Sequence, residues 1–409
     1  MSELLVKGLR VMGGKNNRQD LSYFKIAVFG MIIMILGMGI GRFFYTPVFP
    51  VMLDEGLFTF KQLSYIASAN YGGYLVGSMF FSFCRFGYIS RAPYMLSGAA
   101  IVTSALIFAM VLTTNFYLVF FIRFAAGIAS AAMMIFGSMM VMQHSHKLWV
   151  IASLYAGVGV GILLGNEYVI IGLSKSLNAK NIWFGAGFIS VVLLLLLFIL
   201  FPRRVDASQF AINESLAHEN IVWWELALIY GLAGFGYIIV ATYLPLMAKT
   251  FNFPLLANHL WSFVGIAIVP SCFIWLWGAH RWGVLRCLML NLLIQGGCVL
   301  LTLFSQSLVL IVLSCIGFGF TFMGTTSLVM PLAKRLYAPY GINLLGLATL
   351  TYGFGQILGP LLTSFLQFGS HAIALSVICG AVALFAAAGI CQYCLCKKVV
   401  GVSETRNLH

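Results

Sequence analysis

Long apolar runs separated by short polar segments dominate the chain. The runs lack the strict alternation of apolar and polar positions that a barrel strand requires, and about 20 apolar residues are enough for one helix to cross a membrane. The runs and their breakers predict an all-α membrane protein with twelve transmembrane helices, at residues 24–53, 60–84, 93–113, 115–141, 148–173, 181–201, 222–248, 257–279, 284–305, 307–332, 341–366 and 370–394.

One polar connection is longer than the others and divides the helices into two sets of six. We expect an N-terminal tail at 1–22, a six-helix bundle at 23–201, a linker at 202–220, a second bundle at 221–394 and a tail at 395–409. The first segment is polar and basic without a long apolar core, so we expect no cleavable signal peptide.

The two halves also resemble each other in sequence. Four positions recur at one offset of 195 residues: Gly39 and Gly234, Gly41 and Gly236, Pro50 and Pro245, Met52 and Met247. Arg85 and Gly87 recur at an offset of 196 residues as Arg281 and Gly283. Duplicated halves with a site between them near the bilayer midplane are typical of transporters, so we expect two pseudo-symmetric bundles.

Composition excludes several classes of protein. The 409 residues are 61% apolar and only 8% charged, which excludes a water-soluble globular enzyme, a disordered chain and a secreted disulfide scaffold. The net charge of +13 does not indicate nucleic acid, because the basic residues cluster between apolar runs. Of the 23 lysines and arginines, seventeen lie on one expected side and four on the other. This bias predicts a multi-pass protein of the plasma (inner) membrane with both termini cytoplasmic.

Three charged residues fall inside the expected spans of the first half. Arg42, Arg123 and Glu167 lie about 16, 12 and 9 Å from the outer ends of their helices, at 1.5 Å per residue. A charge at such a depth is usually functional, and the surplus arginine suits a carboxylate. There are alternatives for each residue. Arg42 could snorkel to the headgroups, Arg123 could pair with Glu167, and Glu167 could reach the outer water.

Polar stripes at helical spacing accompany these charges on four spans. On the first span, the i, i+3, i+4 spacing predicts that Arg42, Tyr45 and Thr46 share one helical face. Such stripes either line a wet cavity or form hydrogen bonds between helices. Because four occur together, we expect a central path whose substrate-binding residues are Arg42, Tyr45, Thr46, Tyr71, Tyr74, Arg123, Tyr237, Tyr352 and Gln356.

Glycines and a proline mark two spans as candidate moving parts. Gly157 and Gly161 allow close approach of another helix, and Gly359 with Pro360 predicts a bend in the eleventh span.

Several of these segments carry a family resemblance. The segment Trp277 to Arg286 resembles the cytoplasmic signature of the major facilitator superfamily. Arg281 and Gly283 match the signature, and His280 stands where the family has Asp. Gly278 lies two residues after the position of the signature's first glycine. Arg123 and Gly127 resemble the family's Arg-x-x-x-Gly pattern. The Gly39–Phe43 and Gly355–Pro360 segments resemble the bacterial YbfB/YjiJ-type branch.

The resemblance implies the superfamily fold and a role in the cytoplasmic gate for residues at these helix ends. The gating residues we expect, together with the glycines and proline above, are Arg85, Arg91, Gly278, His280, Arg281, Gly283 and Arg286. The alternative for the arginines is that they only set membrane orientation.

Together these features predict a secondary transporter that works by alternating access. We expect proton-coupled uptake (symport) of a small anionic or zwitterionic solute by a monomer in membrane lipid, with Glu167 as the coupling residue. The alternative is a drug or metabolite exporter, favoured by the aromatic content and the Gly-rich fifth span. A receptor or a membrane enzyme is remote, because no span holds paired carboxylates or a His/Cys metal set. We expect no catalytic residue, cofactor or metal, and no ATP-binding loop is present.

Overall fold

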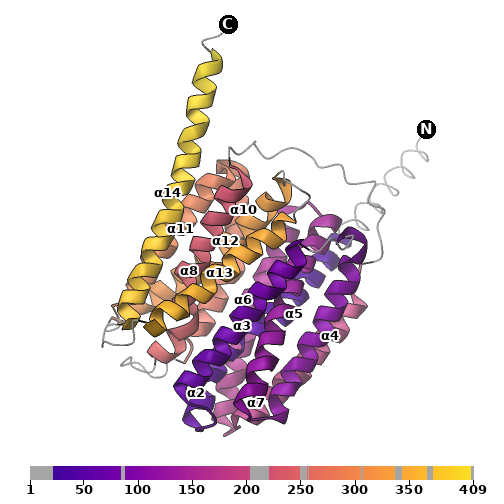
Figure 1. Ribbon diagram of the computed structural model, residues 1–409. Coiled ribbons are helices and arrows are strands. Elements are labelled where there is room, and N and C mark those ends of the chain that lie inside the picture. Colours follow the sequence, from indigo (N-terminus) through magenta and orange to yellow (C-terminus); the bar gives the residue numbers. More distant parts are fainter. Residues whose placement is uncertain are drawn as a thin grey trace, which may run out of the picture.

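Helices make up all the regular structure of the described residues. The computed structural model describes residues 22–83, 88–202, 221–248, 256, 258–304, 307–336, 343–365 and 372–406. Within these ranges eleven helices are long and apolar enough to cross a membrane (Figure 1). The first is Ser22–Asp54, which contains a π-helix, η1 (Ile35–Phe43), followed by α2 (Tyr45–Asp54).

The remaining helices follow the predicted order. They are α3 (Phe60–Phe83), α4 (Tyr88–Leu112), α5 (Phe116–His144), α6 (Leu148–Ser174), α7 (Ala179–Ile199), α8 (Trp223–Ala248), α10 (Leu260–Trp282), α11 (Val284–Leu301), α12 (Leu308–Arg335), α13 (Leu344–Phe365) and α14 (Ala372–Arg406).

Helix α3 is the one that is not among the eleven. Its less apolar sequence reflects a polar face that is buried inside the protein, where Asn70, Tyr71, Tyr74 and Ser78 all lie. A helix that faces other helices on that side gains from polar contacts that lipid does not offer.

The predicted ranges agree with these helices to within five residues, except at one end. The last helix is predicted to end at 394, but α14 continues to Arg406, inside the segment predicted as a tail. Lys397 and Lys398 mark the edge of an apolar run, but lysine is a good helix former and does not end a helix.

The helices pack in two groups that follow the chain. Among the first six, α3 and α4 pack against α5, α4 packs against α7, and α6 packs against η1. Among the last six, α10 packs against α12, α8 against α13 and α14, and α11 against α12 and α14. The main contacts between the groups are α6 with α10 and α3 with α13 (Figure 1).

Two ends of the molecule serve as reference points. The α2 end holds the end of α2 and the start of α7, which are joined by a 2.8 Å hydrogen bond from Ala179 N to Glu55 Oε1. The α14 end is the opposite one, from which α14 projects beyond the other helices (Figure 1). Helices α5 and α12 both run from the α2 end to the α14 end.

Glycines allow η1 and the helix around it to pack closely against α6. A Cβ added to Gly39 would lie 2.5 Å from the Cα of Gly161 in α6, so both residues must be glycine. Gly157 packs in the same way against the backbone of Met31. These two α6 glycines therefore serve packing inside the first group, whereas Gly159 faces the carbonyl of Gly265 across the groups.

Candidate functional site

The Arg42 side chain lies at the contact between the two groups of helices. It is only 2% exposed, and its Nη2 donates a 2.5 Å hydrogen bond to Gln356 Oε1 on α13. The Gln356 Nε2 in turn donates to the hydroxyl of Tyr237 on α8. Within the described part of the chain, Arg42 Nε and Nη1 have no hydrogen-bond partner. These hydrogen bonds connect Arg42 of the first span to Gln356 and, through it, to Tyr237. All three are predicted binding residues, and the last two come from different spans of the second half.

Two tyrosines of α3 complete one side of this site. The Arg42 Cζ lies 4.0 Å from the ring centroid of Tyr74 and 5.3 Å from that of Tyr71, distances at which a cation and a ring attract each other. The Tyr71 hydroxyl lies 3.0 Å from Thr242 Oγ1 on α8. Both tyrosines therefore touch the guanidinium or the opposite half.

A column of stacked rings forms the other side. Tyr352 stacks on Tyr230 at 4.3 Å and on Tyr237 at 5.2 Å, and Tyr237 stacks on Phe322 of α12 at 4.6 Å between centroids. Phe43, next to Arg42, meets Phe322 edge-on at 5.6 Å. Sequence reasoning missed Phe322, because a phenylalanine in an apolar run carries no signal of its own.

Arg123 lies beside Arg42 but bonds to its backbone. Its Nη1 and Nη2 donate to the carbonyls of Gly41 and Arg42 at 3.0 and 3.1 Å. A π-helix leaves such carbonyls without regular α-helical partners, and π-helices occur often at functional sites. The structure therefore does not show the alternative of an Arg123–Glu167 ion pair.

The expected common face of Arg42, Tyr45 and Thr46 is not formed as α-helical spacing implies. The π-helix changes the register just before Tyr45, whose hydroxyl donates to the carbonyl of Leu63 at 2.9 Å. The Tyr45 ring lies 5.0 Å from the Arg123 Cζ. Thr46 is half-buried and takes part in none of the hydrogen bonds found among the described residues.

Glu167 belongs to a separate polar cluster at the α2 end. Its Oε1 accepts a 2.5 Å hydrogen bond from Ser262 Oγ and lies 2.9 Å from His259 Nδ1. Its neighbour Asn166 donates to the Asn258 carbonyl and to Ser262 Oγ at 2.9 and 2.8 Å. We call these five residues the α6–α10 cluster. It joins the two groups of helices, and nothing in the sequence pattern indicated that His259 and Ser262 face Glu167.

A contact between the groups also exists at the α14 end. Lys334 Nζ at the end of α12 donates a 2.7 Å hydrogen bond to the carbonyl of Met142 near the end of α5. Partial burial and the nearby charges of Lys334 and Arg335 lower the pKa of His146, in the connection after α5, below its ordinary value. Contacts at both ends indicate an arrangement in which the central residues are enclosed.

The expected gating residues occupy helix ends and one crossing. Gly283 separates α10 from α11 with a φ of 90°, a conformation that only glycine adopts readily. Its neighbours there are Gly278, His280, Arg281 and Arg286, and the Arg281 Cζ lies 4.5 Å from the Trp277 ring. Arg91 lies in α4, and Arg85 lies outside the described residues. In α13, Gly359 packs against Ile238 of α8, next to Pro360.

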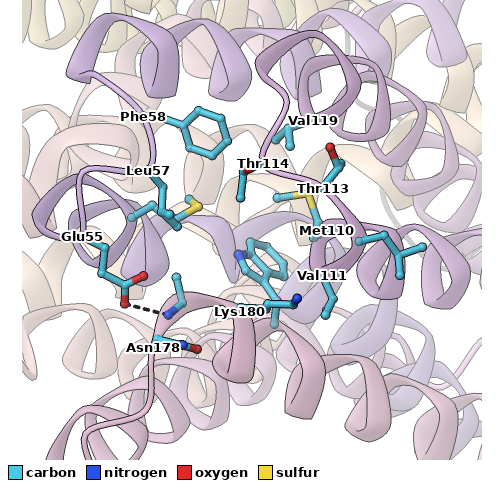
Figure 2. Close-up of a pocket in the computed structure, with 14 residues that line it drawn as sticks. Glu55, Leu57, Phe58, Met110, Val111, Thr113, Thr114, Val119, Asn178 and Lys180 are labelled. Atoms are coloured by element: carbon cyan, nitrogen blue, oxygen red, sulfur yellow. Dashed lines mark hydrogen bonds between the residues drawn. The ribbon is translucent and has the colours of Figure 1, made fainter.

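A separate cavity of about 310 Å³ opens at the α2 end of the first group (Figure 2). Glu55, Asn178 and Lys180 lie on one side of it, and Phe58, Met110 and Thr114 are among the residues on the others. Trp183, which also lines the cavity, has its ring 6.0 Å from the Arg123 Cζ. This cavity lies within one group of helices, away from the contact at which Arg42 meets Gln356.

Metal ligands form no cluster in the described part of the chain. No group of three or more His, Cys, Asp or Glu side chains gathers there as a metal site would require.

Comparison with known families identifies the chain. Residues 34–392 match the model of the family described as "Uncharacterised MFS-type transporter YbfB". A search of curated proteins finds no match. The family match covers most of the chain, including η1, the α6–α10 cluster and the whole Arg42 site. The protein is therefore a multi-pass membrane protein that belongs to the YbfB-type family of major facilitator superfamily transporters.

Proposed function

We propose that the protein transports a small organic anion, and that Arg42 binds its carboxylate. The observation that carries this proposal is a buried guanidinium whose Nε and Nη1 have no hydrogen-bond partner among the described residues. A buried cation is costly unless it is paired, and a charge-assisted hydrogen bond to a carboxylate satisfies both the charge and the donors.

The charges around Arg42 favour an anion. Four acidic side chains are described, and three of them bond elsewhere: Glu55 to the start of α7, Glu167 in the α6–α10 cluster, and Glu225 to Lys397 at 3.6 Å. The fourth, Asp54, ends α2. Arg123 next to Arg42 adds a second positive charge. A zwitterionic solute is a second candidate, because its ammonium group could face the rings of Tyr71 and Tyr74.

Uptake of labelled carboxylates into proteoliposomes tests this proposal. We expect uptake of at least one mono- or dicarboxylate by the wild type and a loss of 100-fold or more in Arg42→Ala. Tyr65→Phe, an exposed tyrosine of the same helix as Tyr71, serves as a control that keeps uptake. Transport of carboxylates that is unchanged in Arg42→Ala would contradict the assignment.

We further propose that transport proceeds by alternating access between bundles 23–201 and 221–394. The α6–α10 cluster then closes the α2 end, and the Lys334–Met142 contact closes the α14 end. The basic residues favour the α14 end as the cytoplasmic one, in an inner membrane. Substrate from outside would enter when the α6–α10 cluster opens.

Glu167 is the candidate for coupling to protons. Its carboxylate accepts two hydrogen bonds from the opposite bundle, so protonation would weaken this contact and favour opening of the α2 end. We expect Glu167→Gln to keep exchange of substrate but to lose uphill accumulation under a pH gradient. Ser262→Ala, which removes one hydrogen bond but keeps the carboxylate, should retain accumulation. Uphill accumulation by Glu167→Gln at the wild-type level would exclude Glu167 as the coupling residue.

Export of planar aromatic compounds, including aromatic cations, is the second candidate function. The stacked column of Tyr230, Tyr352, Tyr237 and Phe322 favours it, because flat rings stack on such a surface. The same proteoliposomes separate the two functions, since an exporter would move aromatic cations and leave carboxylates outside.

A further inference from the structure

A second feature of the structure lies on the outside of the helix bundle, between its two halves. A groove of about 800 Å³ runs between α3, α8 and α13, and Ala383 of α14 borders it. The first half of the chain contributes Leu75 and Met79 of α3 to this groove, and the second half contributes the other lining residues. It is distinct from the Arg42 site, although Leu75 directly follows Tyr74.

The lining of this groove is almost entirely hydrocarbon. The hydroxyl of Thr351 is the exception along its length, and it already donates a 3.0 Å hydrogen bond to the carbonyl of Ala348 in its own helix. The rim consists of apolar side chains such as Met79 and Phe354, each 56% exposed. A polar solute would find no partner here, so the occupant must be apolar over the length of the groove.

Glycines create the depth of the groove. Gly355 of α13 packs against the backbone of Gly231 in α8, so tightly that a Cβ on Gly355 would overlap the Gly231 carbonyl. Small residues let two helices cross closely and leave a depression beside the crossing. Both glycines line the groove, together with larger residues such as Leu228 and Leu358.

One end of the groove has residues that are typical of the membrane–water interface. Trp223 and Trp224 line it at the start of α8, and tryptophan is enriched where hydrocarbon meets headgroups. The next residue, Glu225, pairs with Lys397 at 3.6 Å, and Lys397 is half exposed. Trp223, Trp224 and the Glu225–Lys397 pair thus lie together at one end of the groove. Helices α8 and α13 are both long and apolar enough to cross the membrane.

We propose that this groove binds one acyl chain of a membrane phospholipid, with the headgroup beside Trp223 and Trp224. The occupant is a lipid because the groove opens on the faces of membrane-spanning helices, where lipid is the solvent. Lipid tails are as apolar as leucine, so shape and packing, rather than hydrophobicity, make this chain more persistent than its neighbours.

The position of the groove gives the bound chain a consequence. It touches both halves at the α3–α13 contact, where Gly353 packs against Tyr74 and Leu75. A chain seated there stabilises the enclosed arrangement of the helices, and must rearrange when the halves move apart. Lipid binding in the groove does not depend on the identity of the transported solute.

Photolabelling tests the proposal on the intact protein. The probe is phosphatidylethanolamine with a diazirine near the middle of one acyl chain, reconstituted with the wild-type protein and mapped by peptide mass spectrometry. The comparison surface is the exposed apolar face of α7, with Phe184, Phe188 and Leu195. We expect at least threefold more labelling per exposed side chain on the groove segments of α8 and α13 than on α7.

A groove-filling variant provides the second measurement. Leu228→Trp places a bulky indole ring in the groove, and Leu195→Trp is the matched change on α7. We expect the first to reduce groove labelling at least threefold and the second to leave it unchanged. Equal labelling of the groove and α7 in the wild type, which needs no variant, would overturn the proposal. Groove labelling that persists in a folded Leu228→Trp protein would do so as well.

Discussion

Arg42 and Gln356 are the residues on which the proposed chemistry depends. The amide of Gln356 holds one Arg42 nitrogen at 2.5 Å, and a glutamate in its place would have nearly the same shape. Gln356→Glu therefore supplies an internal carboxylate that competes with the substrate. We expect the variant to melt at or above the wild-type temperature in a thermal-shift assay, because the buried cation gains an ionic partner.

The same variant should bind substrate at least tenfold more weakly. Tyr237→Phe is a suitable control, because it removes the hydroxyl beyond Gln356 without adding charge. Full substrate affinity in a folded Gln356→Glu protein would show that the unpartnered Arg42 nitrogens do not face the substrate.

Arg123 is predicted to act on structure first. Its two hydrogen bonds satisfy consecutive carbonyls of η1, and a buried unsatisfied polar group costs about 1–3 kcal/mol. We expect Arg123→Gln to lower the melting temperature by several degrees, and Arg123→Lys, which keeps the charge and can donate from its single ammonium nitrogen, to lower it less. Wild-type stability in both variants together with lost substrate binding would instead identify Arg123 as a direct ligand.

At the scale of elements, the helices follow from hydropathy but the π-helix does not. Eleven spans are readable because each carries a long apolar run. The π-helix depends on donors from another helix, Arg123 and Ser130 of α5, which bond to the carbonyls of Gly41, Arg42 and Gly37. A pattern along one helix contains no information about those partners. For the same reason the expected face of Arg42, Tyr45 and Thr46 fails where the register changes.

The glycine crossing between η1 and α6 gives a prediction for these elements. Gly39→Ala would place a methyl group 2.5 Å from the Cα of Gly161, so the two helices must move apart. We expect a loss of about 1–3 kcal/mol in stability, as for an overpacked core.

The matched control is Gly98→Ala in α4, where an added Cβ meets nothing within 4 Å. It should be neutral or slightly stabilising in the same melting experiment, since alanine favours a helix more than glycine does. Equal melting temperatures for the two variants would contradict the close approach of η1 and α6.

At the scale of the whole molecule, the sequence predicts the membrane class, and its resemblance to the major facilitator superfamily is confirmed by the family match. Four predicted binding residues (Arg42, Tyr237, Tyr352 and Gln356) lie within one connected network although they come from η1, α8 and α13. The partners of Glu167 could not be predicted, because His259 and Ser262 approach it only when the two halves meet.

The proposed orientation is a prediction at this scale. If the α14 end is cytoplasmic, a protease site added after His409 should stay intact when protease is added to intact cells. The same site should be cleaved when protease is added to inverted vesicles. A site inserted between Lys175 and Leu177, at the α2 end, should show the opposite behaviour. Cleavage of the C-terminal site in intact cells would reverse the orientation and with it the direction assigned to uptake.

The most direct test of the proposed function is a ligand screen by thermal shift on the purified protein. Carboxylates, amino acids and aromatic cations are each compared for the wild type, Arg42→Ala and Gln356→Glu, at pH 5.5 and pH 7.5. A ligand at 100 times its Kd adds about 2.7 kcal/mol, which is readily measured. We expect at least one carboxylate to stabilise the wild type, to stabilise Gln356→Glu less, and not to stabilise Arg42→Ala. Stabilisation by aromatic cations alone, equal in all three proteins, would contradict the anion site at Arg42.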